Sequence, residues 1–553
     1  MAALIAILCI PYAVYAQPNT PDKIFVRLDK TFYVAGETIN YAVFFLNRDP
    51  VRSRIVHVDI IDSHDSVYLK QMLPVTDNSS SGKIEIPVAF QEGNYLFRCY
   101  TSWNLNFGNN FIYHVPLPIY NDLSGEGFDN LYIDGPDKKA DTIGYNENGS
   151  YVISIENNEP VRTGDSVYLN FQTKDRQPAI LSIGVFDLNL IEPFEFNLQK
   201  DYLQRLRSTD VVNTEARYAP EKNLVFQGMI LEQLSSEPVT SNVLTVYDVR
   251  NFSFTRIKSR DGKFLFELPI FEGSADIQII NMNPYQDKVP VVKIQSLVPE
   301  RLPVTFTQNP VVRSDNVIKY LYYSKLRKQI TEVFQRSEAD SIPSSSTLLR
   351  QSIPDKSYSM EDYRYIKDVE DFILQAVQNA SSIREGNMRY PQLFNRETKK
   401  YFMTKPFLMV DNYFVFNDSL VYSIPFSQLH RIDIYNTNSS IFTYFDPIMI
   451  QGGVIAIYTK NNFLGEYVNN LPNLLNVKGL PEKMTKEKLD ISYSHPELEP
   501  VIFWNSIVPT DESGFIRIAY KQNDVTGNCM IQLIGKRPDG QLFEERFTYY
   551  VSE

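Results

Sequence analysis

The feature that most constrains this chain is a run of short alternating apolar and polar segments, each cut off by turn residues. Between Lys23 and Tyr120 the segments KIFVRLDKTFYVAGETINYAVFFLN, RIVHVDIIDSHDSVYLKQM, GKIEIPVAF and GNYLFRCYTSW follow one another. Period-two alternation with a turn about every 8 to 12 residues is typical of antiparallel strands packed as a sandwich. We therefore expect an all-β domain here.

The opening block of this domain returns later in the chain. Placing Gly36 on Gly164 aligns VRLDKTFYVAGETINY with SIENNEPVRTGDSVYL, so that the strand after the turn is reused. Recurrence of a turn and strand indicates tandem sandwiches rather than one large fold. The second copy continues through AILSIGVFDLNLI.

Length and charge limit the classes of protein that remain. A chain of 553 residues, 43% of them hydrophobic, can bury several cores, and domains of about 100 to 200 residues predict three to six units. The net charge of −12 and the absence of a Lys/Arg run argue against a nucleic-acid partner, because phosphate binding needs a clustered basic face.

The N-terminal stretch MAALIAILCIPYAVYAQ is typical of a secretory signal. Its apolar run is shorter than the ~20 residues of a membrane-spanning helix, and Ala13 and Ala16 favour cleavage before Gln17. No basic residues precede the run, which leaves open a true start upstream of Met1. Cys9 raises the alternative of a lipid anchor. We expect an exported protein of the periplasm, outer membrane or cell surface.

Residues 222–297 predict a third β unit, in which the tight turn at Asp261-Gly262 between SFTRIK and FLFEL predicts a hairpin. Helical spacing then appears at 317–335, where Leu326, Ile330, Val333 and Phe334 share one face. A Ser-rich connector follows, and a second amphipathic helix is expected at about 361–378.

Three apolar strand candidates come next, PFLMVDNYFV, IPFSQLHRIDIYN and IMIQGGVIAIYTK, and with the preceding helix they predict a small α/β unit. The segment from Val454 to Tyr458 is too continuously apolar for a one-sided sheet, so both of its faces should be covered. Gly452 and Gly453 permit backbone angles or a close chain approach that a Cβ would obstruct.

Several of these blocks resemble known families. The turn Asp29-Lys30-Thr31-Phe32-Tyr33-Val34-Ala35-Gly36-Glu37 and the ending YTSWNLNFGNNFIYHVPLPIY resemble macroglobulin-type β-sandwich domains of Bacteroidetes-type envelope proteins. Asn157-Asn158 replaces Asp-Lys in the second copy. The thioester motif C-G-E-Q of protease-trapping macroglobulins does not occur in the sequence, so the resemblance does not imply covalent trapping.

The later blocks resemble two other families. Gly228, Pro238-Val239 and Asp261-Gly262-Lys263-Phe264 are similar to carboxypeptidase regulatory-like domains. PFLMVDN from Pro406, LHRIDI from Leu429 and the segment from Gly452 to Lys460 resemble the plug domain of TonB-dependent outer-membrane receptors. Fewer than a hundred residues follow Lys460, too few for a barrel of about 22 strands, so the resemblance implies a plug-like domain without its barrel.

The expected fold class is mainly β, with tandem macroglobulin- and Ig-like sandwiches plus one small α/β plug-like domain. The expected boundaries are a signal peptide at 1–16, macroglobulin-like sandwiches at 17–121 and 122–221, a carboxypeptidase regulatory-like sandwich at 222–300, a helical segment and linker at 301–349, the plug-like domain at 350–466 and a C-terminal Ig-like sandwich at 467–553.

The sequence predicts no catalytic, cofactor-binding or metal-ligating residues and therefore no enzyme. His57, Asp59, Asp62 and His64 in HVDIIDSHD could be proposed as a metal cluster, but alternation separates the first pair from the second, and polar residues around a hairpin are favoured. No H-E-x-x-H, G-x-x-x-x-G-K, C-x-x-C or G-x-S-x-G motif occurs in the sequence.

The leading hypothesis is a non-enzymatic envelope protein whose β modules carry a plug-like domain that docks an outer-membrane transport or assembly partner. The first alternative is a glycan- or peptide-binding module, for which the 35 tyrosines and 35 phenylalanines could provide stacking surfaces. The distant alternative is a macroglobulin-like protease inhibitor with a bait segment at 337–358.

Overall fold

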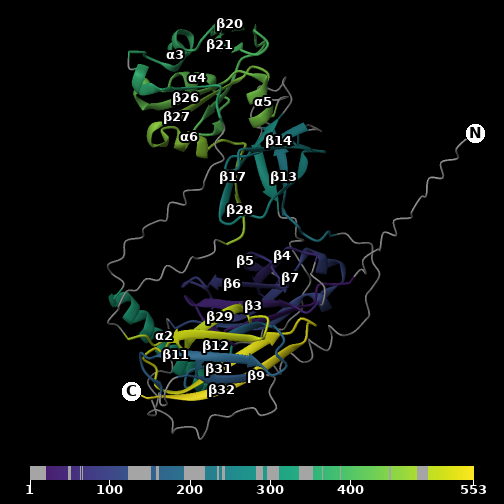
Figure 1. The fold of residues 1–553 in the computed structure, drawn as a ribbon, viewed down its shortest axis with the longest axis vertical. Coiled ribbons are helices and arrows are strands. Elements are labelled where there is room, and N and C mark those ends of the chain that lie inside the picture. The colour runs from purple at the N-terminus through teal and green to yellow at the C-terminus, as the bar shows by residue number, and fades with distance from the viewer. Residues whose placement is uncertain are drawn as a thin grey trace, which may run out of the picture. The chain divides into compact units, whose positions relative to one another are not determined.

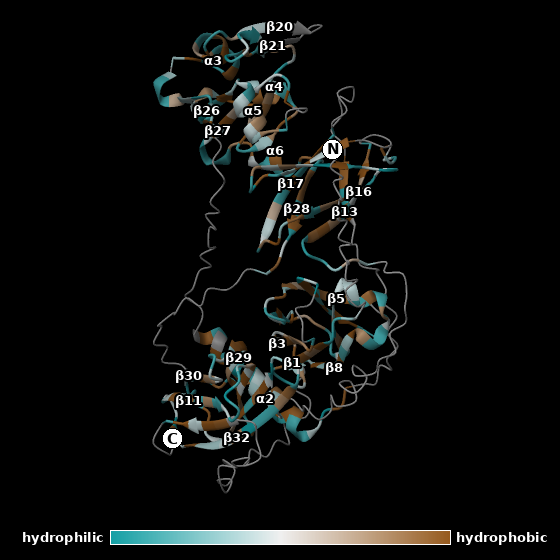
Figure 2. Ribbon diagram, turned by 45° about the vertical axis from the view of Figure 1, so that its right-hand side comes forward, coloured by the Kyte–Doolittle hydropathy of each residue, from teal (hydrophilic) through white to brown (hydrophobic). Residues whose placement is uncertain are grey.

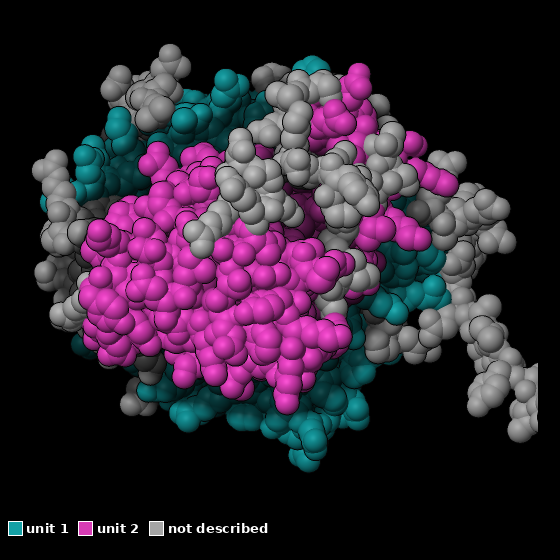
Figure 3. All heavy atoms as spheres, turned by 90° about the horizontal axis from the view of Figure 1, so that it is seen from above, with its two compact units in different colours: residues 1–222, 301–338, 486–553 teal, residues 223–300, 339–485 magenta. Residues whose placement is uncertain are grey.

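A computed structural model describes residues 20–47, 52–62, 64, 66–122, 151–156, 161–191, 218–232, 236–239, 243–281, 291–295, 311–334, 353–363, 365–385, 388–446, 450–481 and 496–552. The chain forms two compact units, coloured separately in Figure 3: residues 1–222, 301–338 and 486–553 make unit 1, and residues 223–300 and 339–485 make unit 2. The expected signal peptide and Cys9 lie outside the described residues.

The first sandwich of unit 1 lies within the expected range of 17–121. Its sheets have the orders β1-β3-β6 and β2-β8-β7-β4-β5, with the short strand β2 pairing parallel to β8. The strands are β1 (Ile24–Leu28), β2 (Tyr33–Val34), β3 (Thr38–Phe45), β4 (Ile55–Ile61), β5 (Val67–Pro74), β6 (Ser79–Glu85), β7 (Gly93–Tyr100) and β8 (Tyr113–Tyr120). Apolar side chains from both sheets form its core.

The second sandwich repeats this topology strand for strand. Its sheets have the orders β9-β11-β30 and β10-β32-β31-β12-β29, and the short strand β10 again pairs parallel to the last strand. The strands are β9 (Tyr151–Ile155), β10 (Val161–Arg162), β11 (Ser166–Thr173), β12 (Ile180–Asp187), β29 (Val501–Pro509), β30 (Phe515–Lys521), β31 (Gly527–Lys536) and β32 (Leu542–Ser552). Gly36 and Gly164 hold equivalent turns, with φ of 92° and 79°.

The repeat shows where the chain is interrupted. In the first sandwich residues 62–66 join the fourth strand to the fifth, whereas in the second sandwich residues 188–500 join β12 to β29. All of unit 2 lies within that connection. In Figure 1 the late strands β29, β31 and β32 lie among the early strands β11 and β12.

The domain boundaries therefore differ from those expected for 122–221 and 467–553. Strand β12 pairs with both β29 and β31, and β11 pairs with β30, so the expected second and C-terminal sandwiches are one domain with one core. Neither half could bury its apolar face alone, because each sheet takes strands from both ends of the interruption. Local alternation identifies strands but carries no information on which strand pairs with which.

Buried cations join the two sandwiches of unit 1. The Arg27 guanidinium donates to the carbonyl oxygens of Ser182 and Gln532, the latter at 3.0 Å, and lies over the Trp504 ring at 4.8 Å. The Lys536 ammonium donates to the carbonyl oxygens of Phe45 at 3.1 Å and Asn78 at 3.0 Å. Burial lowers the pKa of Lys536 to about 8.

The first predicted helix is confirmed as α2 (Asp315–Phe334), but its buried face is not the expected one. Leu326 and Ile330 are half-buried and Val333 is 69% exposed. The buried positions are instead Val317, Tyr320, Leu321, Ser324 and Arg327. Because α2 packs against charged groups of the first sandwich, some of its buried side chains are polar. The spacing of apolar residues alone does not identify such a buried face.

Unit 2 begins with a sandwich whose sheets have the orders β16-β13-β18 and β15-β14-β17-β28. The strands are β13 (Leu224–Leu231), β14 (Val243–Asp248), β15 (Ser253–Lys258), β16 (Lys263–Leu268), β17 (Ser274–Asn281), β18 (Val291–Gln295) and β28 (Leu474–Lys478). Strand β28 pairs with β17, so residues 474–478, which were expected in the C-terminal sandwich, belong to this one instead. The expected boundary at 300 therefore misses one strand.

The tight turn at Asp261-Gly262 is present, with φ of 50° and 74° and a bridge between Arg260 and Lys263. The strands it joins, β15 and β16, nevertheless belong to different sheets. The turn is thus a corner of the sandwich and not the tip of a two-stranded hairpin.

The small α/β domain is confirmed within unit 2. Its mixed sheet has the order β19-β26-β27-β24-β25, in which only the β24 and β27 pair is parallel among the described strands. The elements are β19 (Lys356–Ser359), α3 (Val369–Ala376), β20 (Ser381–Glu385), β21 (Met388–Gln392), β22 (Phe394–Asn395), β23 (Lys400–Tyr401), β24 (Phe407–Val410), β25 (Tyr413–Phe414), α4 (Asp418–Tyr422), β26 (Leu429–Tyr435), α5 (Asn438–Tyr444), β27 (Val454–Thr459) and α6 (Gly465–Asn469).

Both faces of this sheet are covered, as the apolar run from Val454 predicts. Ile455 and Ile457 pack into the core formed with α3, α4 and α6. Val454 and Ala456 face the other way and pack with α5 and with Tyr247 of the adjoining sandwich. Figure 2 shows the hydrophobic residues concentrated along the strands of both units.

The helix expected at about 361–378 is shorter than predicted. A 3-10 turn covers Met360–Tyr363, and α3 begins only after Asp368, whose carboxylate accepts a hydrogen bond from the Asp371 backbone N–H at 2.8 Å. Ser359, just before the expected start of this helix, is the last residue of β19. Asp368 is the N-cap of α3, since its side chain satisfies a backbone N–H of the first turn.

Candidate functional site

The turn from Asp29 to Glu37 in the first sandwich is held by buried polar contacts. The Asp29 carboxylate accepts hydrogen bonds from the Tyr33 hydroxyl and from the Asn40 backbone and side-chain N–H groups, at 3.1 and 2.9 Å. Burial raises the pKa of Asp29 even though Lys30 is next to it. The polar side chains of this turn thus fix the backbone between β1 and β3.

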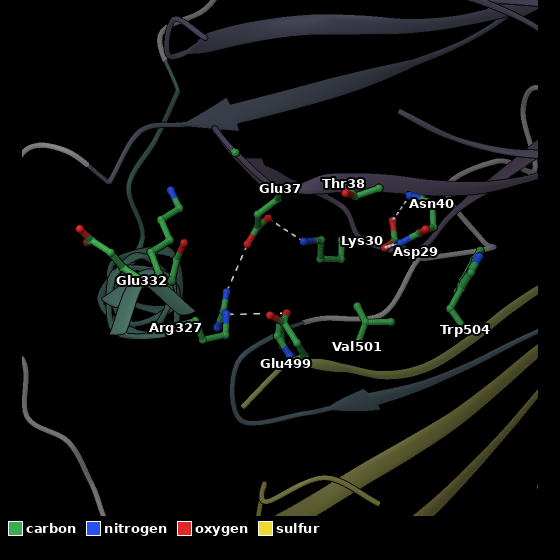
Figure 4. Close-up of a pocket in the computed structure, with 14 residues that line it drawn as sticks. Asp29, Lys30, Glu37, Thr38, Asn40, Arg327, Glu332, Glu499, Val501 and Trp504 are labelled. Carbon is green, nitrogen blue, oxygen red and sulfur yellow. Dashed lines mark hydrogen bonds and ion pairs between the residues drawn. The ribbon is translucent and has the colours of Figure 1, made fainter. Parts of the chain in front are cut away.

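Glu37 is the centre of a buried charge network that joins this turn to α2. Its carboxylate contacts the Lys30 ammonium at 2.6 Å, the Tyr320 hydroxyl at 2.7 Å and the Arg327 guanidinium at 3.2 Å. Figure 4 shows Glu37 between Lys30 and Arg327. Burial opposes ionisation of Glu37, yet the two cations hold its pKa below the ordinary value. Two cations and one hydroxyl thus compensate a carboxylate removed from water.

Further contacts fix α2 along the sandwich. Lys328 donates to the Ala35 carbonyl oxygen at 2.7 Å and pairs with the Asp122 carboxylate, also at 2.7 Å. Ser324 donates to Asp122 at 3.0 Å. Around these contacts Val317, Tyr320 and Leu321 pack into an apolar cluster with side chains of both sandwiches. Helix α2 is therefore an integral part of unit 1, although unit 2 precedes and follows it in the chain.

A pocket of about 570 Å³ lies beside this network, between the turn, α2 and the start of β29. Figure 4 shows its side chains, with Arg327 reaching from Glu37 to Glu499. The lining residues are Asp29, Lys30, Gly36, Glu37, Thr38, Asn40, Ser324, Arg327, Lys328, Glu332, Glu499, Pro500, Val501 and Trp504.

Arg327 is the side chain of the pocket best placed to bind a ligand. It is 8% exposed, its Nε lies 3.7 Å from the Glu499 carboxylate, and its NH1 is buried with no hydrogen-bond partner in the described structure. A guanidinium presents its donors as a planar fork that suits a carboxylate. Sequence patterns do not reveal this pocket, because it combines Glu37 with Arg327 and Glu499, about 290 and 460 positions later in the chain.

The polar residues considered as a metal cluster do not converge. The His57 Nε2 lies 2.6 Å from Glu221 and Asp59 pairs with Arg98 at 2.7 Å, whereas Asp62 accepts the His64 backbone N–H within the turn. Among the residues that the structure describes, no group of three or more His, Cys, Asp or Glu side chains could hold a metal ion. Cys99 and Cys529 are buried in separate sandwiches, and burial raises the pKa of both thiols.

The two glycines at the start of β27 occupy positions that a side chain could not share. A Cβ on Gly452 would lie 1.9 Å from the Lys405 carbonyl oxygen. Gly453 has φ of 80°, and its Cβ would lie 2.9 Å from the Tyr435 carbonyl oxygen. The prediction of a close chain approach and special backbone angles is confirmed. The glycines thus allow β27 to enter the sheet between β24 and β26, which pair with it on either side.

The α/β domain exposes several large apolar side chains. Met403 is 90% exposed, Tyr365 75%, Ile353 72% and Phe442 63%. Such side chains mark an interaction surface when they form one contiguous patch, whereas singly exposed ones are common on proteins. No helix among the described residues is long and apolar enough to span a membrane.

No protein-family model and no curated protein matches the chain. Solved structures with some likeness include trypsin-activated α2-macroglobulin from Escherichia coli, at 9% identity and a TM-score of 0.25, over 97% of this chain and 42% of that one. Salmonella α2-macroglobulin reacted with methylamine matches at 8% identity and a TM-score of 0.25, over 96% and 40%. A β-glucuronidase from Parabacteroides merdae matches at 8% identity and a TM-score of 0.12, over 50% and 25%.

The chain thus spans about two-fifths of the length of the macroglobulins it matches. Likeness at these TM-scores does not extend to function. The sandwich architecture of unit 1 rests on its own strand pairing.

Proposed function

We propose that this is a non-enzymatic, exported envelope protein in which unit 1 is a scaffold and unit 2 docks an outer-membrane transport or assembly partner. The observation that carries the proposal is the insertion of unit 2 between two adjacent strands of the second sandwich. Insertions of this kind place a functional module on a rigid support, as binding loops do on a smaller scale.

The chain crosses between the two units at four points, near residues 222, 300, 338 and 485. Two of these crossings flank α2, whose buried charge network ties it to unit 1. The chain therefore links unit 2 covalently to unit 1 at more than one point. The exposed apolar side chains of its α/β domain provide the kind of surface a partner would cover.

The test is affinity purification of the tagged chain from native membranes, with identification of bound proteins by mass spectrometry. Gly453→Val should disrupt the α/β domain and lose the partner. Gly164→Val is the matched control, because Gly164 has nearly the same φ and lies in unit 1, and among the described residues no atom beyond its chain neighbours lies within 4 Å of its Cβ position. Equal partner recovery with both variants would place docking outside the α/β domain and contradict the proposal.

The pocket beside Arg327 favours a second candidate, the binding of a peptide or glycan that carries a carboxylate. Such a ligand would pair with the unpartnered NH1 and compete with Glu499 for the guanidinium. A thermal shift with acidic peptides or uronate oligosaccharides, lost in Arg327→Met and strengthened in Glu499→Gln, is the expected result. No shift with either ligand class would exclude this candidate.

The distant alternative, a macroglobulin-like protease inhibitor, depends on a bait segment at 337–358. Most of that segment, residues 337–352, lies outside the described residues. It remains a prediction, tested by whether cleavage there leaves a protease trapped.

A further inference from the structure

One hairpin of the α/β domain differs from the rest of this acidic chain. Residues 396–405, here called the tip, read RETKKYFMTK and carry four basic side chains against one acidic side chain. The whole chain has a formal net charge of −12. Arg396, Lys399 and Lys400 are exposed and make no ion pair with any residue that the structure describes. The tip is thus a local positive surface.

Exposed apolar side chains alternate with these cations. Met403 is 90% exposed and Tyr401 is 44% exposed, and between them Phe402 turns inward. Leaving a methionine this far in water has no packing benefit in the free protein. A surface that combines cations with protruding apolar groups is typical of segments that lie in a membrane interface.

The tip is held in place rather than loosely extended. Strands β22 and β23 pair through Phe394 with Tyr401 and Asn395 with Lys400. The Asn395 side chain accepts the backbone N–H groups of Glu397 and Thr398, each at 3.0 Å. A preformed tip loses little conformational entropy when it binds.

The far end of the tip is fixed as well. The Phe402 backbone N–H donates to the Leu393 carbonyl oxygen at 3.1 Å, and the Gln392 side chain donates to the Phe402 carbonyl oxygen at 2.8 Å. Lys405 pairs with Asp418 at 2.6 Å. Lys399, Lys400 and Met403 are therefore exposed side chains of one hydrogen-bonded hairpin.

We propose that this tip binds the surface of an anionic lipid bilayer, with Lys399 and Lys400 at the headgroups and Met403 inserted at the acyl boundary. The inference concerns a second contact of unit 2, beyond docking to a protein partner. A protein site is less suited to the tip, because interface cores are depleted in lysine and a stable interface takes about 20 to 30 residues a side. At an anionic bilayer, in contrast, each lysine contributes separately to the free energy of binding.

The test is cosedimentation of the full chain with vesicles of phosphatidylcholine, with and without phosphatidylglycerol. Binding is expected only when phosphatidylglycerol is present and should weaken as salt is raised. Lys399→Glu/Lys400→Glu should reduce the partition coefficient by more than about tenfold, since each lysine contributes on the order of fivefold. Met403→Ser should reduce it by about tenfold through loss of apolar burial.

The matched control is Lys258→Glu/Lys263→Glu, which makes the same charge change at exposed positions of the sandwich in unit 2. It should leave vesicle binding nearly unchanged. Absence of binding to phosphatidylglycerol vesicles at low salt would overturn the proposal, as would equal losses in the tip and control variants. Tip variants that bind vesicles normally but lose a copurifying protein would show that the tip is a protein site instead.

Discussion

Two constraints act on Gly453, a positive φ and close neighbouring atoms, and they can be separated experimentally. Its φ of 80° disfavours any residue with a Cβ, and the Cβ itself would lie 2.9 Å from both the Leu393 Cδ1 and the Tyr435 carbonyl oxygen. Gly164 has φ of 79°, but in the described part of the chain no atom other than those of its two neighbours lies within 4 Å of its Cβ position. The pair therefore distinguishes backbone strain from crowding.

We expect Gly164→Ala to cost about 1 to 2 kcal/mol, the cost of the left-handed conformation alone. Gly453→Ala should cost a further 1 to 3 kcal/mol or so, because the neighbouring carbonyl cannot move without disturbing β26. Denaturant unfolding, followed by proteolysis of each unit, measures both. Equal costs for the two variants would show that crowding at β27 is relieved without strain.

Asp187 is a buried carboxyl at the point where β12 ends and the insertion begins. It is 2% exposed and accepts the Asn189 backbone N–H at 2.9 Å. Burial raises the pKa of Asp187 to about 6. The folded chain therefore holds this proton across a pH range in which the unfolded chain has lost it, so the stability that Asp187 contributes is full below about pH 4 and is lost as pH rises through 6.

Asp187→Asn removes the titrating group while keeping a carbonyl oxygen as acceptor. We expect it to stabilise unit 1 by about 1 to 2 kcal/mol near pH 7.5 and to have little effect near pH 4, because only the ionised form is penalised by burial. Denaturation midpoints at the two pH values provide the measurement. An equal shift of the denaturation midpoint at both pH values would show that the substitution does not act through ionisation of Asp187.

At the scale of elements, α2 packs on unit 1 through both apolar and charged side chains. Its apolar positions contribute Val317, Tyr320 and Leu321, while Arg327 and Lys328 reach Glu37, Ala35 and Asp122 on the first sandwich. Breaking one member of a buried ion network is costly, because the remaining charges keep their desolvation penalty.

Glu37→Gln should therefore loosen α2, with a cost of about 3 to 5 kcal/mol because Lys30 and Arg327 are left uncompensated. Amide hydrogen exchange over 315–334 should speed up. Glu332→Gln on the same helix is the control, since Glu332 is exposed, and exchange there should stay as in the parent chain. Unchanged exchange in Glu37→Gln would mean that the apolar cluster alone holds the helix.

How far the sequence predicts an element depends on whether the signal is local. The strands of the first sandwich, the turn at Asp261-Gly262 and the covered strand after Gly453 follow from alternation, turn chemistry and apolar runs. The buried face of α2 does not, because the polar residues that face inward are compensated by Glu37, far away in the chain. The pocket beside Arg327 was missed for the same reason.

At the scale of the molecule, the sequence revealed the repeat but not its interruption. The turns at Gly36 and Gly164 mark the start of two similar sandwiches, yet the second sandwich takes half of its strands from residues 501–552. The alternating pattern of those four strands alone predicts a separate small sandwich. Nothing in local patterning distinguishes a separate domain from the second half of an interrupted one, since pairing partners are a property of the tertiary fold.

The architecture of unit 1 therefore depends on strands before and after unit 2 forming a single sandwich. The most direct test is amide hydrogen exchange on a chain that stops after residue 481, compared with the full chain. Loss of β29 to β32 should remove protection from β11 and β12, which pair with β30, β29 and β31. Strands β3, β4 and β7 of the first sandwich should stay protected. Protected β11 and β12 in the shortened chain would contradict the account and restore an independent C-terminal domain.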